Sequence, residues 1–196
     1  MYFLYNALNE PIPSDIQDLI LHYLPLSSLL ALSKLPKMRP VVQKHLRLRV
    51  INLLRCFTPS PDLCLRMMRQ TGTVISGSSA LSVVAPGVCS PHDLNLYCPK
   101  GSARSAMQHL LALPGVRRES FPARMFGAER THFSKLDVNC GIRKMYRFFH
   151  EETNKTITLF ESIDSSPLVP ILFFHSSVLM NYVDAREVVS FYSSLT

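Results

Sequence analysis

The sequence predicts an α+β protein, in which a short N-terminal helical segment precedes a small mixed sheet flanked by helices. Apolar residues recur at helical spacing up to about residue 58, whereas short β-branched runs alternate with helical stretches from about residue 62. The run Thr58-Pro59-Ser60-Pro61 separates the two patterns. Apolar residues make up 47% of the 196 residues, which is enough for a core. We therefore expect two units, residues 1–58 and residues 62–196.

The N-terminal unit is expected to form three helices. Ser14 is a candidate N-cap for the first, because apolar residues at helical spacing follow it directly. Pro25 interrupts this helix, and Ser27 or Ser28 can cap a second one that is rich in leucine. A longer, basic amphipathic helix is expected after Pro40.

Residues 12–33 combine an Ile-Pro start, a short helix with a Leu-Ile pair, a break at Pro25 and a Leu-rich helix. This arrangement resembles an F-box, although Ile12 replaces the usual leucine and Ser28 stands where aspartate is common. The resemblance implies docking on a Skp-type subunit of a ubiquitin ligase. The partner-binding residues would be Ile12, Pro13, Ile16, Leu19, Ile20, Leu24, Leu29 and Leu32.

Two short helices cannot bury their own apolar stripes, so something else has to cover them. Either a partner chain covers them, or they pack on the second unit of this protein. The sequence leaves both alternatives open.

The second unit is predicted to mix helices and strands. Ser102 is a candidate N-cap, and Pro114-Gly115 is a stop signal for the helix between them. The expected elements are a helix over 63–70, a strand over 73–76, helical turns over 79–84, a strand over 93–97, a helix over 102–113, a hairpin of 141–149 and 155–160, and helices over 174–183 and 185–192.

Gly77-Ser78 follows the strand 73–76 directly, and Asp93-Leu94-Asn95 opens the next strand. Positions i and i+2 of a strand share a face, so Asp93 and Asn95 are expected to point the same way. The pattern resembles the nucleotidyltransferase superfamily, in which a Gly-Ser turn approaches the triphosphate and three strand carboxylates hold two metal ions. The resemblance implies a ligand site formed by Gly77, Ser78, Ser79, Asp93 and Asn95.

The carboxylate set departs from that family. Asn95 stands at the second carboxylate, and a neutral amide oxygen lacks the charge that hard dications require. The expected third strand, 155–160, has no acid, which leaves Asp137 or Glu161 for the role. We therefore expect no catalytic residue, no metal and no cofactor. An active enzyme would instead use Asp93, Asp137 and Glu161 with Mg²⁺ or Mn²⁺, and an unrelated α/β core is a third interpretation.

With the C-terminal stretch 174–182 included, most of the chain resembles fungal proteins that join an F-box-like N-terminus to a degenerate nucleotidyltransferase-like domain. The implied function is that of a non-catalytic adaptor, a pseudoenzyme whose helices dock on the Skp-type subunit while the α/β domain recognises a target protein. The alternatives are a divergent metal-dependent nucleotidyltransferase and an inactive nucleotide- or RNA-binding version of that fold.

The net charge of +7 adds nucleic acid as a possible partner, because basic residues gather in two places. Solvated helix faces and loops are the alternative explanation for both groups. The five cysteines are odd in number and lack a Cys-x-x-Cys pair, which is typical of reduced thiols. Without a signal peptide or a membrane-length apolar run, we expect a cytoplasmic or nuclear protein with no membrane contact. The basic groups are Lys34, Lys37, Arg39, Lys44, Arg47, Arg49 and Arg55, and then Arg117, Arg118, Arg124 and Arg130.

Overall fold

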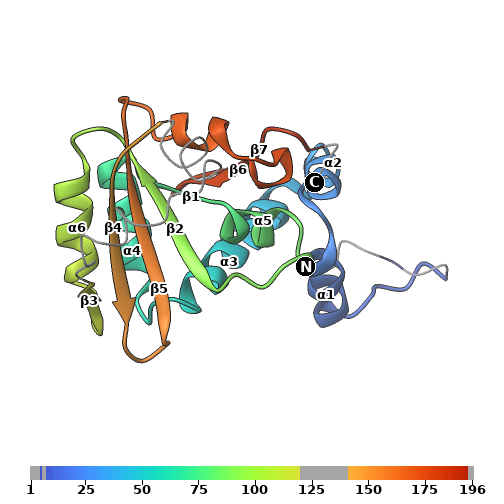
Figure 1. The fold of residues 1–196 in the computed structure, drawn as a ribbon. Helices are drawn as coiled ribbons and strands as arrows, with labels where there is room; N and C mark the ends of the chain where they lie inside the picture. Colours follow the sequence, from blue (N-terminus) through green and yellow to red (C-terminus); the bar gives the residue numbers. More distant parts are fainter. Residues whose placement is uncertain (1–4, 6–7, 120–140, 194–196) are drawn as a thin grey trace.

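The computed structural model describes residues 5, 8–119 and 141–193 (Figure 1). Within these ranges it contains six α-helices and a mixed sheet of seven strands, which confirms the predicted α+β class. The helices are α1 Ser14–Tyr23, α2 Leu26–Ser33, α3 Arg39–Arg55, α4 Pro61–Thr71, α5 Ser78–Val84 and α6 Ala103–Leu111. The strands are β1 Val74–Ser76, β2 Asp93–Cys98, β3 Val116–Arg118, β4 Ile142–His150, β5 Lys155–Ser162, β6 Asn181–Val183 and β7 Val188–Ser190.

The strands follow the order β3-β4-β5-β2-β1-β6-β7 across the sheet. The central pair, β2 and β5, is parallel, and the remaining neighbours are antiparallel. Because side chains alternate along each strand, Leu94 and Leu96 of β2 face one side while Tyr97 faces the other. The sheet therefore has two distinct faces, each with its own apolar cluster.

The main core lies on the face that carries Leu94 and Leu96. Helices α3, α4 and α6 cover it; α3 contributes Val50, Leu53 and Leu54, and Phe57 follows just after that helix. The expected boundary at residues 58–62 coincides with the connection between α3 and α4, yet α3 shares a core with the sheet. Only α1 and α2 stand apart from this core. They lie at the end of the molecule opposite α6 and β3 (Figure 1).

A smaller cluster holds α1 and α2 to the first half of α3. Leu21, Leu29 and Val42 are its buried members, one from each helix. This cluster is the internal core of the three-helix segment. The other large apolar residues of α1 lie on its solvent-facing side.

Proline and glycine, and not capping side chains, mark the start of α1 and both ends of α4. Helix α4 has Pro61 at its start and ends at Gly72, whose φ of 67° is the left-handed conformation that favours glycine. Ser14 is the first residue of α1 and not its cap, because Pro13 occupies that position. Ser102 precedes α6 as expected but its side chain makes no capping hydrogen bond.

The prediction of two helices over residues 174–183 and 185–192 is wrong. The chain instead forms 3₁₀ turns at Val169–Phe173 and Ser177–Leu179, followed by the β6–β7 hairpin. Asp184 Oδ1 accepts hydrogen bonds from the backbone N–H groups of Arg186 (2.6 Å) and Glu187 (2.7 Å), which closes the turn between the strands. The 3₁₀ segment covers the second face of the sheet, where Tyr97 and Ile171 are buried.

Candidate functional site

The turn between β1 and α5 has a backbone that only glycine adopts readily. Gly77 is buried, with φ of 74° and ψ of −147°. A β-carbon there would lie 3.8 Å from Nδ2 of Asn95, so the turn faces the start of β2 directly. Ser79 Oγ donates a hydrogen bond to the carbonyl of Asp93 at 2.8 Å and ties α5 to that strand. The structure thus brings the expected residues of the Gly-Ser turn to Asp93 and Asn95.

Asp93 and Asn95 lie side by side on one face of β2. Asn95 Nδ2 donates a hydrogen bond to Asp93 Oδ2 at 2.9 Å, and both side chains are half-buried. The amide therefore turns the positive end of its dipole toward the carboxylate of Asp93. In this arrangement the amide occupies an oxygen of Asp93 that a cation would otherwise use.

The neighbouring strand β5 places threonines beside this pair. Thr156 is opposite Asp93 and Thr158 is opposite Asn95 in the parallel register. Arg147 of β4 donates a hydrogen bond to Thr156 Oγ1 at 3.3 Å, and its Nε lies 3.1 Å from Glu119 Oε2. Beside Asp93, strand β5 thus contributes hydroxyl groups, and β4 contributes a guanidinium.

Glu161 is not brought to Asp93. It pairs with Cys98 at the opposite end of β2, and its side chain is only 5% exposed. Its carboxylate accepts a hydrogen bond from the Gly101 N–H at 2.8 Å and lies 3.6 Å from Arg143. It lies five positions along the strand from Thr156, a span of roughly 16 Å. Glu161 therefore fixes the loop before α6 and does not share a site with Asp93.

Asp137 lies outside the described residues. His92, next to Asp93 in sequence, is exposed. Across the described ranges, no three side chains of His, Cys, Asp or Glu gather closely enough to hold a metal ion. Asp93 is the one expected carboxylate that the described structure places at the Gly-Ser turn.

Replacing Asn95 with aspartate tests the relation of this site to metal binding. Asn95→Asp places two carboxylates where an amide now donates to Asp93, so we expect the variant to lose about 1–2 kcal/mol of stability in EDTA. We also expect Mn²⁺ to restore that loss, because paired carboxylates suit a hard dication. Thermal unfolding with and without MnCl₂ measures both effects. Asn52→Asp on α3 is the control, and an equal Mn²⁺ response in wild type and Asn95→Asp contradicts the expectation.

The second candidate surface is the outer face of α1. Ile16, Leu19, Ile20 and Tyr23 follow one another at helical spacing and are 42%, 52%, 39% and 65% exposed. Tyr23 was missed among the expected partner-binding residues, although its spacing from Ile16 and Leu19 places it on the same face. We call these four residues the α1 stripe.

The other expected partner-binding residues take different places. Pro13 is exposed, whereas Ile12, Leu24 and Leu32 are half-buried, the last two against the small cluster. Leu29 is fully buried in that cluster, so it is a core residue of the helical segment and not a contact for another chain. The surface open to a partner is therefore centred on α1.

Arg49 fixes α1 in the orientation that exposes the stripe. Its guanidinium is buried and donates hydrogen bonds to the carbonyls of Leu21 (2.5 Å), His22 (3.0 Å) and Leu24 (2.6 Å) at the end of α1, and to Val83 (3.0 Å) of α5. Burial lowers the pKa of Arg49 to about 10, so the group is still cationic at neutral pH. The sequence groups Arg49 with basic residues that suit either a solvated helix face or a nucleic-acid contact, and in the structure the other members of that group are exposed.

His45, one turn before Arg49, completes this contact. Arg49 Nε donates to His45 Nε2 at 3.1 Å, which requires that nitrogen of the imidazole to be unprotonated. Burial and the charge of Arg49 both lower the pKa of His45. The neutral histidine and the cationic arginine thus form one buried unit.

No family model matches the chain, and no curated protein and no solved structure matches it either. No helix among the residues that the structure describes has both the length and the apolar composition needed to cross a bilayer.

Proposed function

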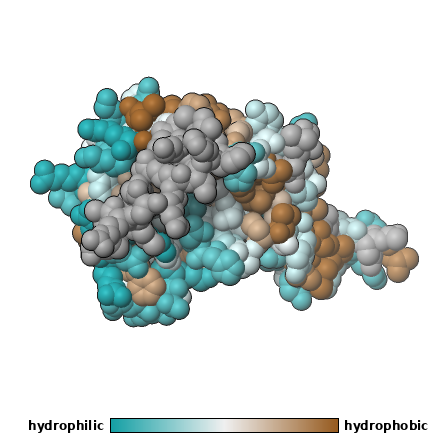
Figure 2. Space-filling view, viewed as in Figure 1, coloured by the Kyte–Doolittle hydropathy of each residue, from teal (hydrophilic) through white to brown (hydrophobic). Residues whose placement is uncertain are grey.

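We propose that the protein is a non-catalytic adaptor, in which α1 docks on a Skp-type subunit of a ubiquitin ligase and the α/β domain recognises a target protein. The observation that carries the proposal is the α1 stripe, an apolar helix face that stays exposed among the residues that the structure describes. Figure 2 shows apolar side chains gathered over the part of the molecule where the N-terminal helices lie.

The α1 stripe is not needed for the fold of the helical segment. Leu21 and Gln17 are the buried residues of α1, and they lie on its inner face toward α3. Large apolar side chains gathered on one exposed face of a helix are typical of protein contacts. The resemblance of residues 12–33 to an F-box supports the Skp-type subunit as the partner. Burial of a fully exposed leucine or isoleucine contributes about 1.5–3 kcal/mol, so a few such contacts support binding.

The pair of Asp93 and Asn95 supports an adaptor more than a transferase. The second carboxylate position holds an amide that is already bonded to Asp93, and the facing positions of β5 are threonines. A two-metal reaction draws several kcal/mol of charge stabilisation from paired anionic ligands. Incorporation of labelled nucleotide with Mg²⁺ or Mn²⁺, lost in Asp93→Ala, would replace the adaptor proposal with the enzymatic one.

A pull-down with the purified Skp-type subunit tests the proposal. The double variant Leu19→Asp/Ile20→Asp is expected to weaken binding at least about tenfold, because charged side chains at the centre of an apolar contact remove hot-spot energy. Both residues are exposed, so circular dichroism should show an unchanged fold. Leu63→Asp is the matched control, since Leu63 is 41% exposed on α4, outside the α1 stripe.

Two results would contradict the proposal. One is failure of the intact chain to bind the subunit while a known F-box protein binds under the same conditions. The other is binding that Leu19→Asp/Ile20→Asp and Leu63→Asp reduce to the same extent.

A further inference from the structure

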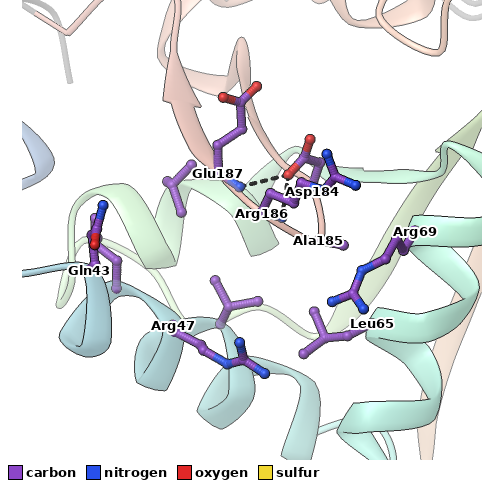
Figure 3. A pocket seen from close by; sticks show the side chains of 11 residues that line it. Gln43, Arg47, Leu65, Arg69, Asp184, Ala185, Arg186 and Glu187 are labelled. Carbon is purple, nitrogen blue, oxygen red and sulfur yellow. Dashed lines mark hydrogen bonds between the residues drawn. The ribbon is translucent and has the colours of Figure 1, made fainter. Parts of the chain in front are cut away.

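A cavity of about 510 Å³ opens between α3, α4 and the β6–β7 hairpin (Figure 3). Its volume lies within the range of small-molecule sites, roughly 300–1,000 Å³. Part of its wall is apolar, formed by Leu46, Val50, Leu65, Ala185 and Val188. It is separate from both surfaces discussed above, because neither the α1 stripe nor Asp93 and Asn95 line it.

Three arginines from three different elements line this cavity. Arg47 comes from α3, Arg69 from α4 and Arg186 from the turn of the hairpin. Figure 3 shows Arg47 and Arg69 reaching into the space beneath that turn. In the described part of the chain, none of the three forms an ion pair with a carboxylate. Each guanidinium therefore keeps its fork of N–H donors for another acceptor.

The two acids of the cavity wall are already engaged within the hairpin. Asp184 Oδ1 accepts the backbone N–H groups of Arg186 and Glu187, and the hydroxyl of Tyr182 lies 3.3 Å from Glu187 Oε1. These bonds stabilise the turn, and among the described residues neither carboxylate forms an ion pair with an arginine. The groups of the wall that remain available to a ligand are thus mainly the three guanidinium groups, which suit an anion.

A second cavity of about 430 Å³ adjoins the first and shares Arg69, Asp184, Ala185 and Arg186 with it. Its other walls come from the end of α4 and the start of β1, from residues 166–168 and from Tyr182. Arg69 and Arg186 therefore stand between two spaces, with apolar surface on either side. A ligand held at these arginines has room for a carbon body.

We propose that this cavity binds a small organic phosphate, with the phosphate held by Arg47 and Arg69 and the carbon body against Leu65 and Val188. Phosphate fits better than a single carboxylate because it offers three oxygens and close to two charges to donors that converge from separate elements. Such a ligand would join α3 and α4 to the C-terminal hairpin, so its binding would also stabilise the fold. The site is independent of the adaptor proposal.

Calorimetric titration of the intact chain with phenyl phosphate, inorganic phosphate and phenol tests the site. Phenyl phosphate is expected to bind saturably and more tightly than either part alone. Arg47→Gln/Arg69→Gln should weaken it by about 10- to 100-fold, the equivalent of one or two lost charged hydrogen bonds. Arg186→Gln should weaken it in the same direction. Arg66→Gln is the control, because Arg66 is exposed on α4 and does not line the cavity.

Three results would overturn the inference: no saturable binding of phenyl phosphate, equal affinity for phenyl phosphate and inorganic phosphate, or equal affinity in wild type and Arg47→Gln/Arg69→Gln. Arg47 and Arg69 are exposed, so the double variant should fold, and its melting temperature without ligand verifies this. Each result leaves the pull-down with the Skp-type subunit unaffected, so the two proposals fail separately.

Discussion

Replacing Arg49 with methionine is expected to destabilise the protein by about 3–5 kcal/mol, because several buried carbonyls lose their charged hydrogen-bond donor at once. Methionine fills a similar volume but donates no hydrogen bond. The carbonyls of Leu21, His22 and Leu24 at the end of α1, and that of Val83 in α5, would lose their donor. We expect α1 to detach from α3 before the sheet unfolds, because Arg49 is the polar link between the helical segment and α5.

Urea unfolding followed by circular dichroism measures the loss, and hydrogen exchange shows where it begins. Amides of α1 should lose protection in Arg49→Met while those of β2 and β5 keep it. Lys44→Met is the matched control, because Lys44 is exposed on the same helix and should change stability little. Arg49→Lys should restore only part of the loss, since one ammonium cannot reproduce the guanidinium fork. Equal stability of Arg49→Met and Lys44→Met would contradict the role given to Arg49.

Phe57→Ala is expected to produce a loss of similar size, about 3–5 kcal/mol, by creating a cavity in the main core. Phe57 has no exposed surface and lies just after α3, where that helix joins the core of the sheet. Unlike the loss of Arg49, this loss should affect the whole fold, because the same cluster contains residues of β1, β2, β4 and β5. Thermal unfolding should remain a single transition at a lower temperature.

Phe173→Ala is the control for Phe57→Ala, since Phe173 is 50% exposed in the 3₁₀ segment. Phe173→Ala should lower the stability of the fold much less than Phe57→Ala does. Selective loss of hydrogen-exchange protection in α1 and α2 after Phe57→Ala would show that α3 belongs energetically to the helical segment and not to the sheet.

Elements with a strong local signal could be predicted from the sequence. The hairpin of β4 and β5 and the helix α6 form close to where alternation, turn residues and stop signals place them. The C-terminal part could not, because the apolar run around Tyr182 and Val183 suits a buried helix or a short strand equally well. This run forms strand β6 because Asp184 closes a turn after it and because it pairs with β1. The pairing with β1 joins residues that are far apart in the chain.

In the candidate site, too, the features set by local sequence could be predicted, and those set by long-range contacts could not. Asp93 and Asn95 could be placed together from one strand, because alternation alone puts them on one face. The position of Glu161 depends on the register between β2 and β5, which local sequence does not specify. Arg49 could not be recognised as a buried residue, because the carbonyls that distinguish it from its exposed basic neighbours belong to α1 and α5, which are distant in the sequence.

The parallel pairing of β2 and β5 has a consequence for how the chain folds. Antiparallel hairpins such as β4–β5 and β6–β7 close over short turns and can form early. The contact between Asp93 and Thr156 has to close a much longer loop, which costs more chain entropy than closing a hairpin turn. We therefore expect the centre of the sheet to be assembled late, so substitutions in β2 should mainly accelerate unfolding, and substitutions in the β4–β5 hairpin should mainly slow folding.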